Sequence, residues 1–414
     1  MGAEHQGEST ADAPSARSRD VSLVDRVISG SWVWVILGTV LIVIALVPSW
    51  RVPIIGDDFY YTLLRYHEYD GSVLSVLSQA WHDDLQPNRY NPVGREVSLT
   101  NHVLARESSA WWGVDLTHWY RLQTLILVWG AVLAAAWALR EAMAYVHRSS
   151  AARLWPLFAG LAAVYATVLQ LHINSHDPTI TIAEIGYGTP ILAFSLFALA
   201  FRSVRASTRR PLVAYCVLAL AGTVYYETFV TAVAAGAGLF VLEWWRGRLS
   251  RARLLWLTGC GLVLPAAVAI IGRAWVSTQD VRYYRGTDIV LGPDGVGVLV
   301  NFGLGAVPGS AWPHTSFAVG GAPVTPAALV LGLSIALMVA VTTWLLLRGG
   351  LPRQRATRRL VIVAGMYAVH LLGSFAMQSF TTKYIREIWH HHVVYLSYAT
   401  AVLMVATVVV ALLA

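Results

Sequence analysis

Two adjacent carboxylates, Asp57 and Asp58, follow the first long apolar run of the sequence within about ten residues of its end. Two carboxylates held close together and partly removed from water can bind a divalent cation such as Mg²⁺ or Mn²⁺. One of them can instead accept a proton from an attacking hydroxyl group. The same pair can also cap the next helix, because aspartate is a favoured N-cap residue. The residue types alone leave chemistry and capping open, and they indicate no other definite cofactor.

Positive groups that suit a phosphate occur in two segments. Arg89 and Arg95 lie in a stretch shaped by two prolines and a glycine, where their guanidinium groups can bind phosphate oxygens or pair with nearby acids. Lys383, the only lysine, and Arg386 follow a later apolar run and can contact a lipid phosphate or ordinary headgroups. His390 opens a run of three histidines and is a candidate ligand contact. Consecutive helix residues do not share a face, so this run predicts no metal site.

A third carboxylate, Glu227, falls between two apolar runs that almost no residues separate. It must therefore lie at a membrane boundary, where an ionisable group usually faces a cavity or a partner. Tyr226 precedes it, and an aromatic ring beside a carboxylate suits sugar recognition. A functional cavity position and a structural ion pair both remain open for Glu227.

The composition shows what kind of protein must position these groups. Of 414 residues, 56% are hydrophobic and 13% charged, with a mean hydropathy of +0.56. A soluble domain carries about 25% charged residues, so the composition excludes a disordered chain and argues against a soluble globule. The net charge of +7 comes from short arginine clusters between apolar runs. That pattern is typical of membrane orientation, and it predicts no nucleic-acid partner.

The apolar runs predict an all-α integral membrane protein with about ten transmembrane helices. Residues 1–22 are polar and predict a disordered cytoplasmic tail, and residues 23–414 form the membrane domain. Cys216 and Cys260 both lie inside apolar runs and are expected to be buried free thiols. The predicted spans lie near 31–49, 119–139, 154–171, 187–201, 211–225, 229–245, 254–272, 326–347, 360–377 and 394–414.

Charge sets the expected orientation. The connections 140–153, 202–210, 243–253 and 348–359 are rich in arginine and contain only two acids, so they are predicted to be cytoplasmic. The long loops 50–118 and 273–325 then face outward and are expected to contribute to the site. Apolar residues at three- and four-residue spacing over 73–85 predict an amphipathic helix in the first of these loops, which either lies in the membrane interface or packs on other loops.

A first span followed by an Asp-Asp pair, an interfacial helix and a downstream Gly94-Arg95 resembles the GT-C superfamily of membrane glycosyltransferases. The resemblance covers the N-terminal third, and the rest of the chain only as topology. It implies a polyprenyl-phosphate-linked sugar donor, a glycan or lipid acceptor of the cell envelope, and inverting transfer on the outer face. It places the general base at Asp57 or Asp58 and suggests donor phosphate binding by Arg95.

The same resemblance makes Asp177 and Glu184 candidate partners for a sugar hydroxyl or a cation. Asp177 precedes a proline, so a plain turn also explains it. Two other functions are compatible with the sequence, a lipid or polysaccharide transporter and a non-catalytic membrane subunit of envelope assembly. The expected location is the plasma membrane in contact with its lipids, and the arginine-rich, lysine-poor composition indicates a bacterial genome rich in GC.

Overall fold

The computed structural model describes residues 31–59, 62–63, 78, 90–147, 153–168, 183–278, 289–305, 351–382 and 385. Nearly all of these residues are helical, and no β-strand occurs among them. A single β-bridge within the same ranges joins Ile289 to Thr381. The all-α class predicted from the apolar runs is therefore confirmed for the part of the chain that the structure describes.

The helices have these bounds in chain order: α2 (Ser31–Leu46), the 3₁₀ helix η1 (Val47–Arg51), α3 (Gly56–Phe59), α5 (Pro92–Trp112), α6 (Leu116–His147), α7 (Leu154–Val168), α8 (Ala183–Arg205), α9 (Arg210–Tyr225), the 3₁₀ helix η4 (Glu227–Phe229), α10 (Val230–Trp245), α11 (Arg251–Thr258), the π-helix η5 (Gly259–Val263), α12 (Leu264–Ser277), α13 (Pro293–Gly305) and α15 (Leu351–Ser379).

Six helical segments are long and apolar enough to cross a membrane: Ser31–Arg51, Leu116–His147, Ala183–Arg205, Glu227–Trp245, Arg251–Ser277 and Arg359–Ser379. Two shorter apolar helices, Leu154–Ala166 and Arg210–Tyr225, coincide with two further predicted spans. The predicted spans 326–347 and 394–414 and the predicted interfacial helix 73–85 lie outside the described residues, apart from Ser78. The count of ten spans therefore stays a prediction.

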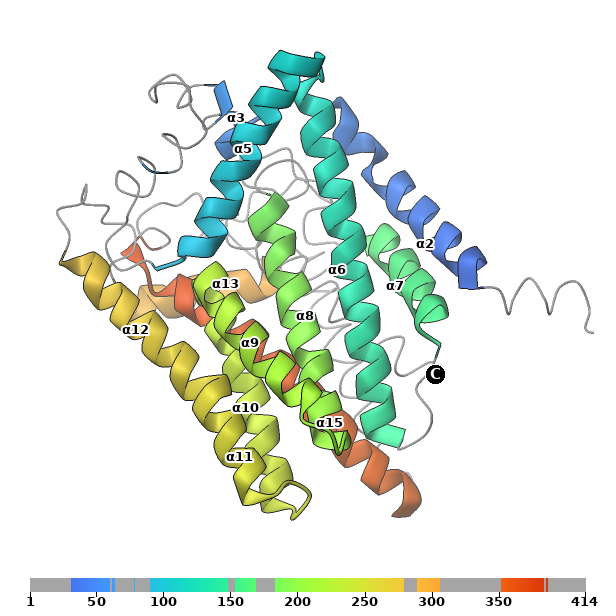
Figure 1. Cartoon of the computed structure of the whole chain (residues 1–414), viewed down its shortest axis with the longest axis vertical. Coiled ribbons are helices and arrows are strands. Elements are labelled where there is room, and N and C mark those ends of the chain that lie inside the picture. Colours follow the sequence, from blue (N-terminus) through green and yellow to red (C-terminus); the bar gives the residue numbers. More distant parts are fainter. Residues whose placement is uncertain are drawn as a thin grey trace, which may run out of the picture.

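Helices α6 and α8 pack side by side along their length and form the centre of the bundle (Figure 1). The buried side of α6 is rich in alanine, which lets two helix backbones approach closely without a bulky interface. The facing side of α8 carries Phe194, Phe197 and Phe201, all fully buried. Their rings pack against Tyr367 of α15 and Tyr145 of α6, so aromatic side chains fill the space between these three helices.

The arginine-rich connections meet at one end of the bundle, which we call the arginine-rich end. Arg205 at the end of α8 pairs with Glu141 of α6. Buried Glu243 at the end of α10 accepts a hydrogen bond from the Tyr145 hydroxyl at 2.8 Å. Arg359 of α15 donates to the carbonyl oxygens of Tyr145 and Val146 at the end of α6. Arg359 thus binds carbonyls at the carboxyl end of α6 that lack a partner within the helix, where the helix dipole favours a positive group.

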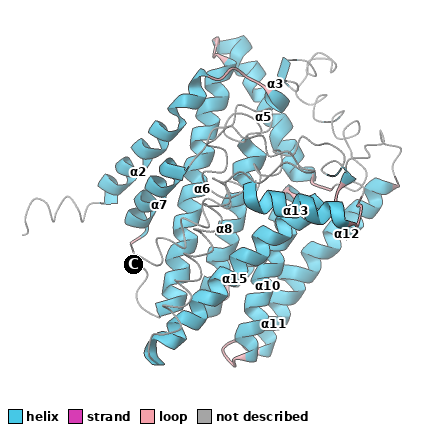
Figure 2. Cartoon of the chain, turned by 180° about the vertical axis from the view of Figure 1, so that it is seen from behind, coloured by secondary structure: helices cyan, strands magenta, loops and turns pink. Residues whose placement is uncertain are grey.

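Helix α5 runs obliquely beside the opposite half of the bundle and contacts α9, α8 and α6 (Figures 1 and 2). The ring of Tyr90, just before α5, packs on Gly272 of α12, where an added Cβ would lie 2.5 Å from the ring. One turn later, Gly94 meets the carboxyl end of α9, where an added Cβ would lie 2.0 Å from the carbonyl oxygen of Tyr225. Only glycine allows this contact between two backbones.

Further along α5, polar side chains reach the first turns of α8 and α6. Ser98 donates a hydrogen bond to the carboxylate of Glu184 in α8, and the ring of His102 contacts the hydroxyl of Tyr120 in α6. The apolar residues Val93, Val97 and Leu104 are exposed and fall on the other face of the helix. The face of α5 toward the bundle therefore carries polar side chains together with the buried apolar residues Leu99 and Val103.

We expect Gly94→Ala to destabilise the protein by about 1–3 kcal/mol, because the new methyl group overlaps a backbone oxygen that cannot rotate away. The thermal midpoint of unfolding of the detergent-purified protein measures this. Gly160→Ala is the matched control, since Gly160 lies in α7 with no atom within 4 Å of an added Cβ. That variant should be unchanged or up to about 1 kcal/mol more stable. Equal midpoints for the two variants would contradict the close contact of α5 with α9.

Candidate functional site

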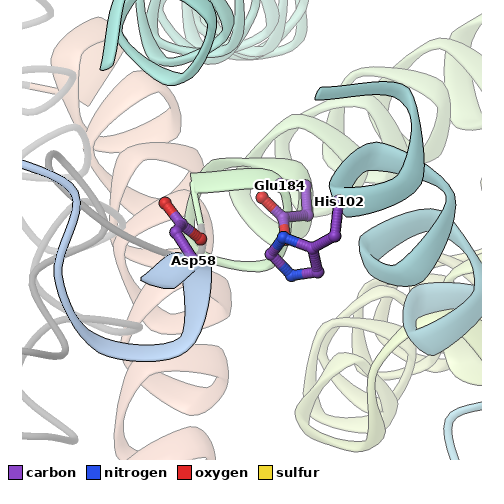
Figure 3. A group of neighbouring side chains, drawn as sticks. All are labelled: Asp58, His102 and Glu184. Atoms are coloured by element: carbon purple, nitrogen blue, oxygen red, sulfur yellow. The ribbon is translucent and has the colours of Figure 1, made fainter. Parts of the chain in front are cut away.

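Three buried side chains from distant parts of the sequence converge beneath α5 (Figure 3). Asp58 comes from α3, His102 from α5 and Glu184 from the first turn of α8. One potential ligand atom of each lies within 4.8 Å of the others. Asp58 is 2% exposed, and His102 and Glu184 are 3% exposed. Charged groups are rarely buried so completely, which makes this cluster the strongest candidate for a functional site among the described residues.

The segment that leads into α3, and so to Asp58, is held by a buried arginine of α6. Arg121 is 1% exposed, and its Nη2 donates hydrogen bonds to the carbonyl oxygens of Val52 at 3.0 Å and Pro53 at 3.2 Å. These carbonyls lie between η1 and α3, where no helix partner satisfies them. A guanidinium group with its rigid array of donors fixes such an irregular segment well, so Arg121 sets where α3 begins.

Thr62, four residues after Asp58, makes a second contact with α6, through Tyr120, the residue before Arg121. Its hydroxyl lies 2.5 Å from the hydroxyl of Tyr120 and 3.3 Å from Nδ1 of His102. The Tyr120 hydroxyl in turn lies 2.8 Å from the same ring nitrogen. Asp58 is therefore held between two anchored segments, and its position depends on Tyr120 and Arg121 together.

Glu184 is oriented by hydrogen bonds from two helices. Ser98 Oγ of α5 donates to Oε1 at 2.6 Å, and Gln123 Nε2 of α6 donates to Oε2 at 3.4 Å. The hydroxyl of Tyr225 donates to the backbone oxygen of Glu184. The ring of Tyr225 reaches that point because Gly188 has no side chain, since an added Cβ would lie 2.2 Å from the Tyr225 hydroxyl.

Burial lowers the pKa of His102 to about 3, so the imidazole is neutral at physiological pH. Ser98 Oγ lies 3.3 Å from Nε2, which connects His102 to Glu184 through one hydroxyl group. A neutral imidazole nitrogen and two carboxylates are all ligands for divalent cations, and here they come from separate, rigid elements. The donor set therefore fits a divalent cation. The sequence suggested such an ion at Asp57 and Asp58, whereas the structure groups Asp58 with Glu184 and His102.

The structure brings together two of the carboxylates predicted from the sequence, Asp58 and Glu184. Asp58 lies inside α3 with its side chain buried in the cluster, so capping of a solvent-exposed helix end does not describe it. Arg95 is half-buried on α5, one turn before Ser98 on the same side of the helix. Burial raises the pKa of its neighbour Glu96, and the Arg95 charge opposes that shift.

Glu227 does not join the described cluster. Its Oε2 lies 3.7 Å from Nη2 of Arg273 on α12, so the structural ion pair foreseen as one of two alternatives is present. Both side chains are partly exposed, which makes this a weak interaction. Tyr226, next to Glu227, is buried in an extended conformation at the end of α9. Tyr226 and Glu227 thus lie in the short connection between α9 and α10, next to Tyr225, which contacts Glu184.

Several predicted site residues fall outside the described residues, so their placement stays a prediction. They are Arg89, Asp177, Lys383, Arg386, His390 and the side chain of Asp57.

Six contributors to the site were not predicted from the sequence: Thr62, Ser98, His102, Tyr120, Arg121 and Gln123. One signal was available for α5, because Gly94, Ser98 and His102 recur every four residues opposite an apolar face. No comparable signal marks Tyr120 or Arg121, which lie in an apolar run that predicts only a span. No protein-family model and no curated protein sequence matches this chain. The site must therefore be interpreted from its own chemistry.

The lowered pKa of His102 predicts a loss of stability in acid. Between its ordinary pKa of 6.5 and about 3, the unfolded chain binds a proton that the folded chain excludes. Stability therefore falls as the pH drops from 6.5, by roughly 3 kcal/mol at pH 4. His102→Gln removes this contribution, while Asp58 and Glu184, which face the ring, are present in both proteins. In denaturation experiments, the free energy of unfolding of the wild type should fall relative to that of the variant between pH 7 and pH 4.

His118→Gln is the control for this experiment, because His118 lies on α6 near the site with a side chain 67% exposed. Its denaturation curves should follow the pH dependence of the wild type. If His102→Gln also follows the wild type throughout this pH range, then His102 is not held neutral by burial.

Proposed function

We propose that this chain is a membrane glycosyltransferase of the GT-C type, which transfers a sugar from a polyprenyl-phosphate donor to an envelope glycan or lipid with inversion. The observation that carries the proposal is the buried Asp58 carboxylate, held opposite Glu184 and His102 where the helices end. A buried carboxylate positioned by two anchored segments is suited to take a proton from an acceptor hydroxyl.

The orientation of the bundle supports this proposal. The arginine-rich end is expected in the cytoplasm by the positive-inside rule, which leaves α5 and the cluster on the extracytoplasmic side. A donor with a polyprenyl tail presents its phosphate and sugar at the bilayer surface. A site at the ends of the spanning helices matches that position. A site in a soluble domain away from the bilayer would not.

The proposed reaction is a single displacement. The acceptor oxygen attacks the anomeric carbon, and its proton passes to Asp58. The bond between that carbon and the donor phosphate oxygen breaks, and the phosphate leaves with the electron pair. Asp58 is 2% exposed, so little bulk water reaches the proposed base.

The leaving phosphate needs positive charge. Arg95 can supply it, because it lies one helical turn from Ser98 and has a guanidinium group that binds phosphate oxygens in pairs. A divalent cation held by Asp58, Glu184 and His102 would add to this neutralisation of the phosphate. The exposed apolar side chains on the other face of α5 offer a surface for the lipid tail.

Transport of a lipid or polysaccharide is the second candidate, and one observation favours it. His370 is 2% exposed near the middle of the α15 span, where ionisable residues often mark a substrate or ion pathway. A non-catalytic role in envelope assembly has no specific structural support, and it predicts that loss of Asp58 is tolerated.

We expect Asp58→Asn to lower sugar transfer by about 10²–10⁴-fold, because the amide cannot accept the proton. Transfer of radiolabelled sugar from polyprenyl-phosphate donors by the purified protein in detergent or nanodiscs measures this. Asp115→Asn is the matched control. Asp115 is exposed at the start of α6, where its Oδ1 accepts a hydrogen bond from the Thr117 backbone, and asparagine caps helices equally well.

Asp57→Asn separates the two members of the acidic pair. The proposal expects a smaller loss for this variant than for Asp58→Asn. Wild-type transfer rates in both variants would refute a base at either position, while a large loss for Asp57→Asn alone would move the base to Asp57.

A further inference from the structure

We propose that Asp58, Glu184 and His102 form a binding site for a divalent transition metal, Mn²⁺ or Zn²⁺, and that the imidazole ligand makes the site discriminate against Mg²⁺. The role of the ion in sugar transfer rests on the proposed function. Binding of the ion itself is a separate property, which can be measured without donor or acceptor.

The geometry of the three ligands supports one shared ion. Bonds from such a metal to oxygen or imidazole nitrogen are about 2.0–2.2 Å long, so ligands on opposite sides of an ion lie about 4.0–4.4 Å apart. The ligand atoms of Asp58, Glu184 and His102 all lie within 4.8 Å of one another. Small side-chain rotations close that distance, and the three elements that carry the ligands need not move.

The surroundings of the ligands resemble the second layer of a metal site. Nδ1 of His102 lies 2.8 Å from the Tyr120 hydroxyl, which fixes the plane of the imidazole ring. Both oxygens of Glu184 receive hydrogen bonds, from Ser98 and Gln123. Metal-binding histidines and carboxylates are typically oriented by outer partners of this kind, which raise affinity by about 10–100-fold.

The ligand types determine which ion fits. Imidazole nitrogen suits Zn²⁺ and the two carboxylates suit Mn²⁺, whereas Mg²⁺ prefers an all-oxygen shell and keeps several of its own waters. The three ligand residues are at most 3% exposed, which leaves little contact with bulk water for a strongly hydrated ion.

Metal binding is compatible with a catalytic Asp58. A carboxylate has two oxygens, of which one can contact the ion and the other can accept the proton of the acceptor hydroxyl.

Titration of the chelator-treated full chain with Mn²⁺, followed by electron paramagnetic resonance, tests the proposal without any sugar substrate. We expect one Mn²⁺ per chain, displaced by equimolar Zn²⁺ because zinc lies higher in the affinity order, and retained in a hundredfold excess of Mg²⁺. Pulsed measurements on the wild type should show coupling to an imidazole nitrogen. Wild-type protein that binds no Mn²⁺ or Zn²⁺, or binds Mn²⁺ without nitrogen coupling, overturns the proposal whatever the variants do.

The variants assign the ligands. His102→Gln should weaken Mn²⁺ binding at least tenfold and abolish the nitrogen coupling, whereas His118→Gln should bind as the wild type does. Retention of the coupling in folded His102→Gln would overturn the assignment. Sugar transfer by protein shown to be free of metal would remove the proposed role of the ion in catalysis and leave the glycosyltransferase proposal standing. Nitrogen-coupled binding without any transfer would reject the enzyme and keep the metal site.

Discussion

Two consecutive side chains of α6, Tyr120 and Arg121, connect the regular helix bundle to the irregular segment that carries Asp58. Both are almost completely buried, and a buried hydroxyl or guanidinium group must find hydrogen-bond partners inside the protein. Arg121 finds them in two loop carbonyls before α3, and Tyr120 finds them in Thr62 and His102. The need to satisfy these groups gives a short, irregular loop a defined place in the fold.

The same end of the bundle concentrates charge that would be costly elsewhere. Glu184 lies in the first turn of α8, where the helix dipole stabilises a negative charge, and two side-chain donors complete its surroundings. His102 faces it from α5 in its neutral form because burial disfavours the charged ring. Such an arrangement contributes little to stability, and its cost is typical of sites that are retained for chemistry.

Most of the spanning helices could be predicted from the sequence, because a run of apolar residues is a strong local signal. Helix α5 was missed, since polar residues interrupt its apolar ones and its mean composition is polar. Asp58 and Glu184 were each singled out, but their meeting depends on packing across 126 positions of the chain that no local pattern encodes. The sequence also could not decide between a cavity position and an ion pair for Glu227, because its partner Arg273 lies in another helix.

We propose an enzyme in preference to a transporter because of where the buried polar groups lie. Within the described residues, the buried acids, arginines and histidines lie at the two ends of the bundle, apart from His370 in the middle of α15. Its Nδ1 lies 2.7 Å from the Thr231 hydroxyl, and its ring packs edge-on against Phe197. An isolated histidine enclosed in this way stabilises the contact between α10 and α15. A transport path needs polar groups at successive depths from one face to the other, whereas a glycosyltransferase needs them only where the lipid-linked phosphate emerges.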